Sequence, residues 1–243
     1  MKSFIQYDVD CHFPIQNLPY GIFSSKENSK LRASVAIGDL VLDLTQCETE
    51  GLLTSNYFKH KTLNQFMSVG KSEWSKVRKQ IQDLLLDSNP TLRDNSDLKE
   101  KLFYNQNEVK MHLPAEIGDY TDFYSSRQHA KNVGAMFRDP ENALLPNWLH
   151  LPVGYHGRSS SIVMSGTDIK RPIGQTMPVG AENPVFGPCK LMDFELEMGC
   201  FIGPGNNLGE PISIKNASEH LFGLILVNDW SARDIQKWEY VPL

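Results

Sequence analysis

Three acidic residues stand at every second position of an otherwise apolar segment: Asp193, Glu195 and Glu197 alternate with Met192, Phe194, Leu196 and Met198. Successive side chains of a strand point to opposite faces, so a strand here places the carboxylates on one face, about 7 Å apart, and the apolar side chains in a core. Like charges at this spacing repel unless a cation or base lies among them, and glutamate is a poor strand former. A solvated acidic strand edge is the alternative, but the pattern favours a metal site.

A fourth acidic residue follows the most apolar run of the chain. The run from Leu221 to Val227 is typical of a buried strand, and Asp229 comes two residues after it. Functional groups often lie where a strand gives way to a loop. Ser231 is expected to cap a short helix that follows. Asp229 is therefore a candidate ligand, with a turn aspartate as the alternative.

A histidine and a fifth acidic residue occur together near residue 125. Ser125 and Gln128 match a capping box, which predicts a helix from about Ser126 to Phe137. The helix carries His129, and Asp122 lies just before it. A lone helical histidine is usually structural, so the residues alone leave its role open.

An all-oxygen site can be assembled from the acidic residues of these segments: Asp122, Glu195, Glu197 and Asp229. Oxygen ligands of this charge select hard cations such as Ca²⁺ or Mg²⁺ over zinc or copper. Four carboxylates around a divalent ion leave excess negative charge. Arg138 and Arg233 are candidates to offset it and to bind an anionic substrate through paired hydrogen bonds.

The elements that must position these residues follow two different patterns. Only 4 of 17 glycines and 3 of 14 prolines precede residue 110. We therefore expect helices in the first part and strands with turns in the second, divided near residues 110–118. The two domains are assigned to residues 1–114 and 115–243.

Local signals in the first part predict a small α+β domain. Gly38-Asp39 between two β-branched runs predicts a hairpin of residues 32–37 and 40–44. Thr62 and Gln65 match a capping box. Apolar residues then recur at helical spacing, which predicts a helix with these residues in the core: Trp74, Val77, Ile81, Leu84 and Leu85.

Composition excludes several classes of protein. The chain of 243 residues is 40% apolar and 22% charged, as in globular domains. Its net charge of −5 gives no attraction to nucleic acid or to anionic membranes, and no apolar run approaches the length of a membrane span. The four cysteines form no metal-binding pair, and no secretory leader is evident. We expect free thiols and a cytoplasmic location.

Several motifs resemble the fumarylacetoacetate hydrolase family, and the resemblance extends over essentially the whole chain. The segments that carry it are residues 13–21, 122–129, 153–160, 193–197 and 228–234. The resemblance implies a mainly β fold with some helix (α+β). It implies an SH3-like barrel followed by a mixed β-sandwich roll that is incomplete at the C-terminus, in a homodimer.

The resemblance also implies an activity and a site. The activity is metal-dependent hydrolysis of a C–C bond in 4-fumarylacetoacetate, a small diketo dicarboxylate, to fumarate and acetoacetate. This is the last step of tyrosine and phenylalanine breakdown. The implied Ca²⁺ ligands are Asp122, Glu195, Glu197 and Asp229, of which Asp229 also reaches a Mg²⁺ site. The implied proton acceptor is His129, and the implied substrate contacts are Tyr124, Arg138, Tyr155, Arg233, Gln236 and Tyr240.

One departure from the family leaves alternatives open. The sequence stops at Leu243, whereas the family's enzymes continue well beyond the matching position. We therefore expect a truncated form that is inactive or poorly stable alone. The alternatives are an inactive metal-binding fragment and a related β-keto-acid decarboxylase or hydratase.

Overall fold

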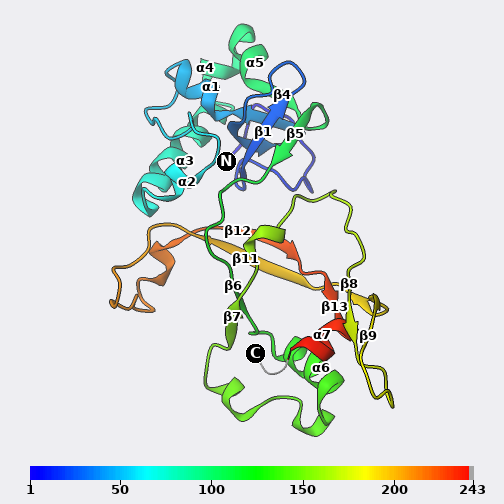
Figure 1. Cartoon of the computed structure of the whole chain (residues 1–243). Coiled ribbons are helices and arrows are strands. Elements are labelled where there is room, and N and C mark those ends of the chain that lie inside the picture. Colours follow the sequence, from blue (N-terminus) through cyan, green and yellow to red (C-terminus); the bar gives the residue numbers. More distant parts are fainter. Residues whose placement is uncertain (241–243) are drawn as a thin grey trace. The chain divides into compact units, whose positions relative to one another are not determined.

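The computed structural model describes residues 1–240, which form two compact units (Figure 1). The first unit comprises Met1–Glu116 and Gly199–Ile225. The second comprises Ile117–Met198 and the described residues from Leu226 to Tyr240. The chain passes from the first unit to the second after Glu116, and the later segment Gly199–Ile225 returns to the first unit.

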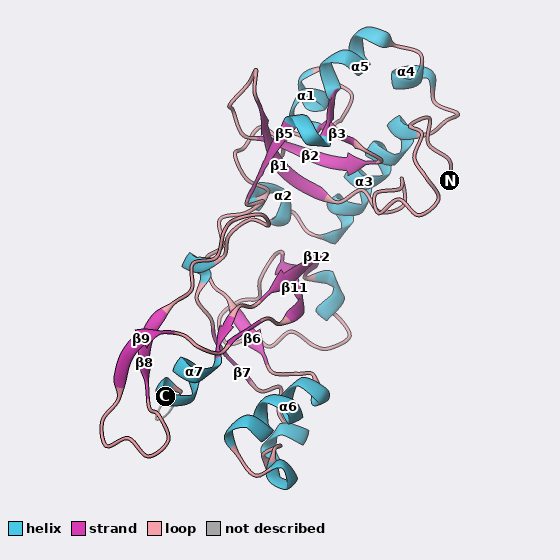
Figure 2. Ribbon diagram, turned by 90° about the vertical axis from the view of Figure 1, so that its right-hand side faces the viewer, coloured by secondary structure: helices cyan, strands magenta, loops and turns pink. Residues whose placement is uncertain are grey.

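The first unit is built on a five-stranded antiparallel sheet with the strand order β4-β3-β2-β1-β5 (Figure 2). The predicted hairpin is confirmed, because Ile37 pairs with Leu40 around Gly38, whose φ of 54° suits glycine. The strands are β1 (Tyr20–Ser25), β2 (Arg32–Ile37), β3 (Leu40–Asp43), β4 (Phe103–Asn105) and β5 (Val109–His112).

Helices of the first unit bury the predicted apolar stripe. They are α1 (Leu44–Thr49), α2 (Asn64–Met67), α3 (Lys71–Leu85), α4 (Pro90–Arg93) and α5 (Ser96–Leu102). All five residues expected in the core are buried on α3. The expected capping box is wrong: Leu63 is the N-cap of α2 and supplies no side-chain hydrogen bond. Asn64 instead bonds the backbone of Glu116 in both directions.

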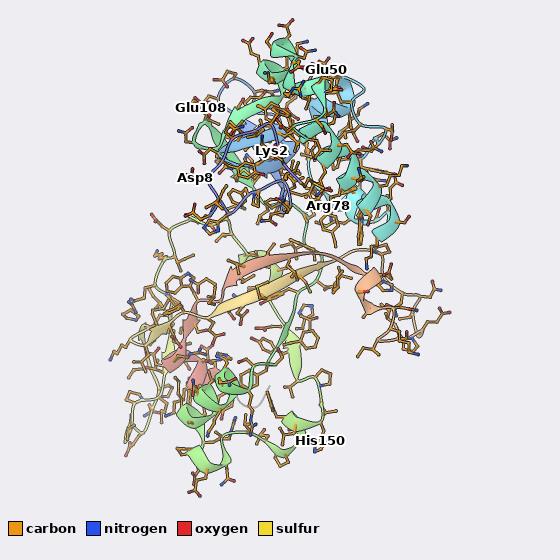
Figure 3. The ribbon with its side chains drawn as sticks, turned by 180° about the vertical axis from the view of Figure 1, so that it is seen from behind. Lys2, Asp8, Glu50, Arg78, Glu108 and His150 are labelled. Atoms are coloured by element: carbon orange, nitrogen blue, oxygen red, sulfur yellow. The ribbon has the colours of Figure 1, made fainter. Side chains whose placement is uncertain are left out.

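Aromatic side chains fill one side of the core of the first unit. The ring of Phe222 lies 5.6 Å from that of Phe66 and 5.2 Å from that of Trp74, and Tyr20 packs 5.3 Å from Phe66. Arg78, labelled in Figure 3, fastens α3 to the N-terminal loop by donating to carbonyl oxygens of residues 16–18.

In its described residues, the second unit consists of short two-stranded antiparallel sheets and two helices. Its paired strands are β6 (Thr121–Phe123) with β7 (Gly154–His156), β8 (Ile173–Thr176) with β9 (Val185–Pro188), and β10 (Met192–Asp193) with β13 (Ser231–Ala232). Its helices are α6 (Arg127–Phe137) and α7 (Arg233–Glu239). The described part of the chain also has 3₁₀ turns, at Pro140–Asn142, Pro146–Leu149 and Ser159–Ser161 in the second unit and at Gln106–Glu108 and Ala217–Glu219 in the first.

The remaining strands, β11 (Leu196–Ile202) and β12 (Leu221–Asn228), pair with each other. The predicted burial of their apolar residues is wrong, since Leu196, Met198, Leu224 and Leu226 are 63 to 76% exposed. Phe194 is also 67% exposed and lies in a break between β10 and β11. Alternation itself is confirmed, with the acidic side chains on the less exposed face. A covering layer is what buries an apolar run, and none of residues 1–240 supplies it here.

The fold is therefore a mixture of helices and small antiparallel sheets. Among the helices of residues 1–240, none has the length and apolar character needed to cross a membrane.

Candidate metal centre and active site

Three predicted ligands meet in the second unit. Asp122 comes from β6, Glu197 from β11, and Asp229 follows the last residue of β12. One carboxylate oxygen from each lies within 4.8 Å of the others. Residues that are far apart in the sequence therefore form one acidic cluster, which we call the carboxylate cluster.

Backbone contacts bring the end of β12 to the start of β11. The amide of Asp229 donates to the carbonyl oxygen of Glu195 at 3.0 Å. The amide of Glu195 donates to Oδ1 of Asn228 at 3.3 Å. These two bonds fix Asp229 close to the strand that carries Glu197.

Crowding of like charges is evident in the carboxylate cluster. Burial, followed by the charges of Asp122, Asp229 and Glu195, raises the pKa of Glu197 to about 7. Burial and the neighbouring carboxylates also raise the pKa of Asp229. A divalent cation would relieve this repulsion, and an all-oxygen donor set suits Ca²⁺ or Mg²⁺. The residues present therefore fit a hard cation.

Glu195, the fourth predicted ligand, lies between the carboxylate cluster and the side chains of Arg233 and His129. Its Oε1 accepts a hydrogen bond from Nη2 of Arg233 and lies 3.4 Å from Nε2 of His129. Its charge and a side-chain hydrogen bond contribute to the raised pKa of Glu197, so the two glutamates are neighbours. Glu195 thus lies between the carboxylate cluster and the imidazole of His129.

Arg233 is buried at the start of α7 and is held from three sides. In addition to Glu195, it donates through Nε to Asp193 at 2.9 Å and through Nη1 to Gln236 at 3.0 Å. The hydrogen bond from Arg233 lowers the pKa of Asp193. Asp193 thus has a defined partner in Arg233. The only sign of this contact in the sequence is that Asp193 alternates with Glu195 and Glu197.

The predicted capping role of Ser231 is wrong. Ala232 occupies the N-cap of α7 and supplies no side-chain hydrogen bond. Ser231 belongs instead to β13, where it pairs with Asp193 on β10. Ser231, which the local pattern assigns to a helix cap, is therefore part of a strand.

His129 lies in the first turn of α6, close to the predicted position. The N-cap is Ser126, whose Oγ accepts from the amide of His129 at 3.3 Å, so the helix starts one residue later than a Ser125 cap implies. The imidazole packs edge-on against Tyr124 with ring centroids 5.6 Å apart. This contact and Glu195 together orient the ring.

Arg138 and Tyr124 line a small cavity of about 90 Å³. α6 ends at Phe137 and Arg138 is its extended C-cap, as its predicted role requires. Arg138 donates through Nη2 to the carbonyl oxygen of Ala143 at 2.9 Å. Its Nε is buried and has no hydrogen-bond partner among residues 1–240. The other lining residues are Ala143, Leu144, Leu145, Asn147, Trp148 and Val153.

Two tyrosines accompany the carboxylate cluster. The hydroxyl of Tyr155 donates to Oδ2 of Asp122 at 2.6 Å, and burial and this bond raise the pKa of Tyr155. Tyr120 is not among the residues predicted from the sequence, because it lies outside the motifs that identify the other site residues. Burial and the charges of the carboxylate cluster raise the pKa of Tyr120 to about 12, which keeps its hydroxyl protonated.

The last two predicted residues lie on or next to α7. Gln236 binds Arg233 and so belongs to the group around Glu195. Tyr240 is the C-cap of α7, and its ring lies 5.2 Å from that of Phe137 on α6. Tyr240 is therefore next to the helix that carries His129 and Arg138.

Two family models match this chain. A family model described as fumarylacetoacetase N-terminal matches residues 16–114. A second model, described as fumarylacetoacetate hydrolase C-terminal, matches residues 119–243. The second match includes every residue of the site described above.

Curated relatives extend the match to the whole chain. Fumarylacetoacetase of Mus musculus is 58% identical over 99% of this chain and 59% of its own length. The enzyme of Dictyostelium discoideum is 58% identical over 100% of this chain and 58% of its own length. That of Arabidopsis thaliana is 55% identical over 100% and 59%, respectively. The chain thus spans a little under three-fifths of the length of these relatives, and it belongs to the fumarylacetoacetate hydrolase family.

Proposed function

We propose that the protein represented by this chain is a metal-dependent hydrolase that cleaves 4-fumarylacetoacetate to fumarate and acetoacetate. The observation that carries the proposal is the carboxylate cluster of Asp122, Glu197 and Asp229, connected through Glu195 to His129. A hard cation beside a base suits hydrolysis of a β-diketone, whose two oxygens chelate such a cation. The name shared by the curated relatives supports this substrate.

The proposed Ca²⁺ ligands are Asp122, Glu195, Glu197 and Asp229, and Asp229 is also proposed to reach a Mg²⁺ ion. When bound, the cation supplies positive charge that offsets the negative charge developing on the diketone oxygens. Of the four carboxylates, Glu195 is already compensated by Arg233, whereas the carboxylate cluster depends on the cation.

Proton transfer is assigned to His129. The imidazole takes a proton from water while the water oxygen bonds to the carbonyl carbon. Glu195, 3.4 Å from Nε2, stabilises the imidazolium that results. The C–C bond then breaks, its electron pair stays with the acetoacetate fragment, and that carbon takes up a proton. One water molecule is thereby divided between the two products.

The remaining residues hold the substrate and the developing alkoxide. Gln236 accepts from Arg233 through Oε1, which leaves its amide nitrogen to donate to the alkoxide. Arg233 contributes positive charge at the same place. The residues proposed to hold the carboxylates and the diketone of the substrate are Tyr124, Arg138, Tyr155 and Tyr240. Holding the substrate in one orientation lowers the entropic part of the activation barrier.

The family also supports proposals about the whole protein. The first unit is proposed to be an SH3-like barrel and the second to be part of a mixed β-sandwich roll, with domains of residues 1–114 and 115–243. The assembled enzyme is proposed to be a cytoplasmic homodimer that performs the last step of tyrosine and phenylalanine breakdown.

The test combines binding and turnover. Calorimetry is expected to show one Ca²⁺ site on the 243-residue chain, and the protein extended to its relatives' length is expected to hydrolyse 4-fumarylacetoacetate. His129→Ala should lower that turnover by about 10²- to 10⁴-fold. Decarboxylation of oxaloacetate in place of hydrolysis would favour the β-keto-acid decarboxylase alternative. Ca²⁺ binding by the chain without turnover is the result expected for an inactive metal-binding fragment.

A further inference from the structure

The hydroxyl of Tyr155 is already engaged by a residue of the carboxylate cluster. It donates to Oδ2 of Asp122 at 2.6 Å, near the short end of the range for hydrogen bonds between oxygen atoms. A residue that serves only to contact substrate needs no such partner. The hydroxyl of Tyr155 thus has a partner within the chain itself, in the carboxylate cluster.

The sheet register explains why the two residues meet. β6 and β7 pair in antiparallel fashion with Asp122 directly opposite Tyr155. Side chains at directly opposite positions lie on the same face of an antiparallel pair and within contact distance. The backbone pairing thus places the phenol beside the carboxylate.

The neighbouring residues restrict movement of this pair of strands. A Cβ on Gly154 would lie 2.9 Å from the ring of Phe123 and 3.0 Å from the carbonyl oxygen of Asp122. The amide of Gly157 donates to the carbonyl oxygen of Tyr120 at 2.7 Å, which extends the pairing beyond the strands. These contacts on either side of residue 155 help to keep β7 in register with β6, so that Tyr155 stays opposite Asp122.

We propose that Tyr155 is a positioning residue for the cation site, whose hydroxyl fixes the rotation of the Asp122 carboxylate toward Glu197 and Asp229. A carboxylate offers about four lone-pair positions, so one bond to the phenol leaves acceptor capacity for a cation. Hydrogen bonds from a second layer orient metal ligands, and their loss commonly costs about 10- to 100-fold in metal affinity. This role rests on the proposed cation site and is additional to any contact with substrate.

The test compares Ca²⁺ binding by three versions of the 243-residue chain, measured by calorimetry. Tyr155→Phe keeps the ring and removes only the hydroxyl, and it should weaken Ca²⁺ binding by about tenfold. Tyr57→Phe, which removes a hydroxyl in the first unit, is the matched control and should bind like the unmodified chain. Thermal unfolding without metal should show the same midpoint for all three.

A spectroscopic measurement separates positioning from a general loss of structure. Europium(III) is a hard cation whose luminescence lifetime shortens when water enters its coordination shell. With Tyr155→Phe, a carboxylate that rotates away should be replaced by water. The bound ion should then have a shorter lifetime in water than with the unmodified chain, and an equal lifetime in deuterium oxide.

The outcomes distinguish this inference from the proposed function. Equal Ca²⁺ affinity and equal europium lifetimes for Tyr155→Phe and the unmodified chain would overturn the inference and leave the cation site standing. An unmodified chain that binds neither ion would overturn both. Weaker binding by Tyr155→Phe, with no hydrolysis by the extended protein, would support the inference and remove the proposed reaction.

Discussion

Nε2 of His129 lies 3.4 Å from Oε1 of Glu195, although the two residues belong to separate segments of the chain. The same carboxylate binds Arg233. Glu195 therefore faces two cationic or basic groups, whereas Glu197 faces carboxylates. Two glutamates at alternate positions of one segment consequently have different surroundings.

This difference predicts unequal effects of neutralising the two glutamates. Glu197→Gln should weaken Ca²⁺ binding by about tenfold or more, because an all-oxygen site is tuned by its ligand charge. Glu195→Gln should cause a smaller loss, since Arg233 already compensates its charge. Calorimetric titration of both variants checks the order. A larger loss for Glu195→Gln would show that Glu195 is the stronger ligand.

Gly134 predicts a packing limit on α6. A Cβ at this position would lie 2.2 Å from the carbonyl oxygen of Ala143, and Nη2 of Arg138 donates to the same oxygen. Gly134→Ala should therefore destabilise the chain by about 1–3 kcal/mol, the usual cost of overpacking. Urea unfolding measures this value. Gly187→Ala is the control, because a Cβ at Gly187 meets nothing within 4 Å, and it should unfold at the same urea concentration.

The buried ion pair of the first unit predicts a second stability effect. Nη1 of Arg32 lies 2.6 Å from Oδ2 of Asp43, and the two side chains are 10% and 0% exposed. Asp43→Asn should lower the free energy of unfolding by about 3–5 kcal/mol, because it leaves a buried guanidinium uncompensated. Chemical denaturation followed by circular dichroism provides the measurement.

An exposed pair supplies the comparison for that variant. Lys2 and Asp87 form a similar contact at 3.1 Å, with side chains 77% and 44% exposed. Asp87→Asn should change stability by less than about 1 kcal/mol. If Asp43→Asn and Asp87→Asn lowered the free energy of unfolding equally, burial of the Arg32–Asp43 pair would make no difference to its contribution to stability.

The cysteines are predicted to react in a fixed order. Burial raises the pKa of Cys47, and it also raises the pKa of Cys189, so both thiols stay protonated at mildly alkaline pH. The thiolate is the nucleophile, so these residues should resist alkylation until the chain unfolds. Cys200 is exposed and should be labelled first. Mass spectrometry after brief exposure to iodoacetamide checks the order; rapid native labelling of Cys47 would contradict it.

Local patterns predicted the elements of the fold well where one segment determines its own structure. The hairpin around Gly38 and the buried stripe of α3 follow from turn chemistry and helical periodicity. Capping was less predictable. Ser231 and Thr62, two predicted caps that are wrong, show why. Ser231 pairs in a strand instead, and Asn64, the first residue of α2, bonds the backbone of Glu116.

For the candidate site, the sequence indicated which acidic residues could lie together, but not what each of them contacts. Alternation in a strand indicated that Glu195 and Glu197 share a face, and the structure has both near Asp229. The pairing of Glu195 with Arg233 depends on contacts between distant segments, which spacing does not encode. The prediction of burial was wrong for the same reason. Leu226 is apolar yet 73% exposed, because the layer that covers a strand is determined by the whole fold and not by the strand's own sequence.

The carboxylate cluster also has a consequence for biosynthesis. During synthesis Asp122 leaves the ribosome well before Asp229 does. The carboxylate cluster therefore depends on contacts between residues that are far apart in the sequence. A cation has no complete binding site to occupy while the early strands are forming. A bound cation should therefore stabilise the folded chain but not the partly synthesised chain.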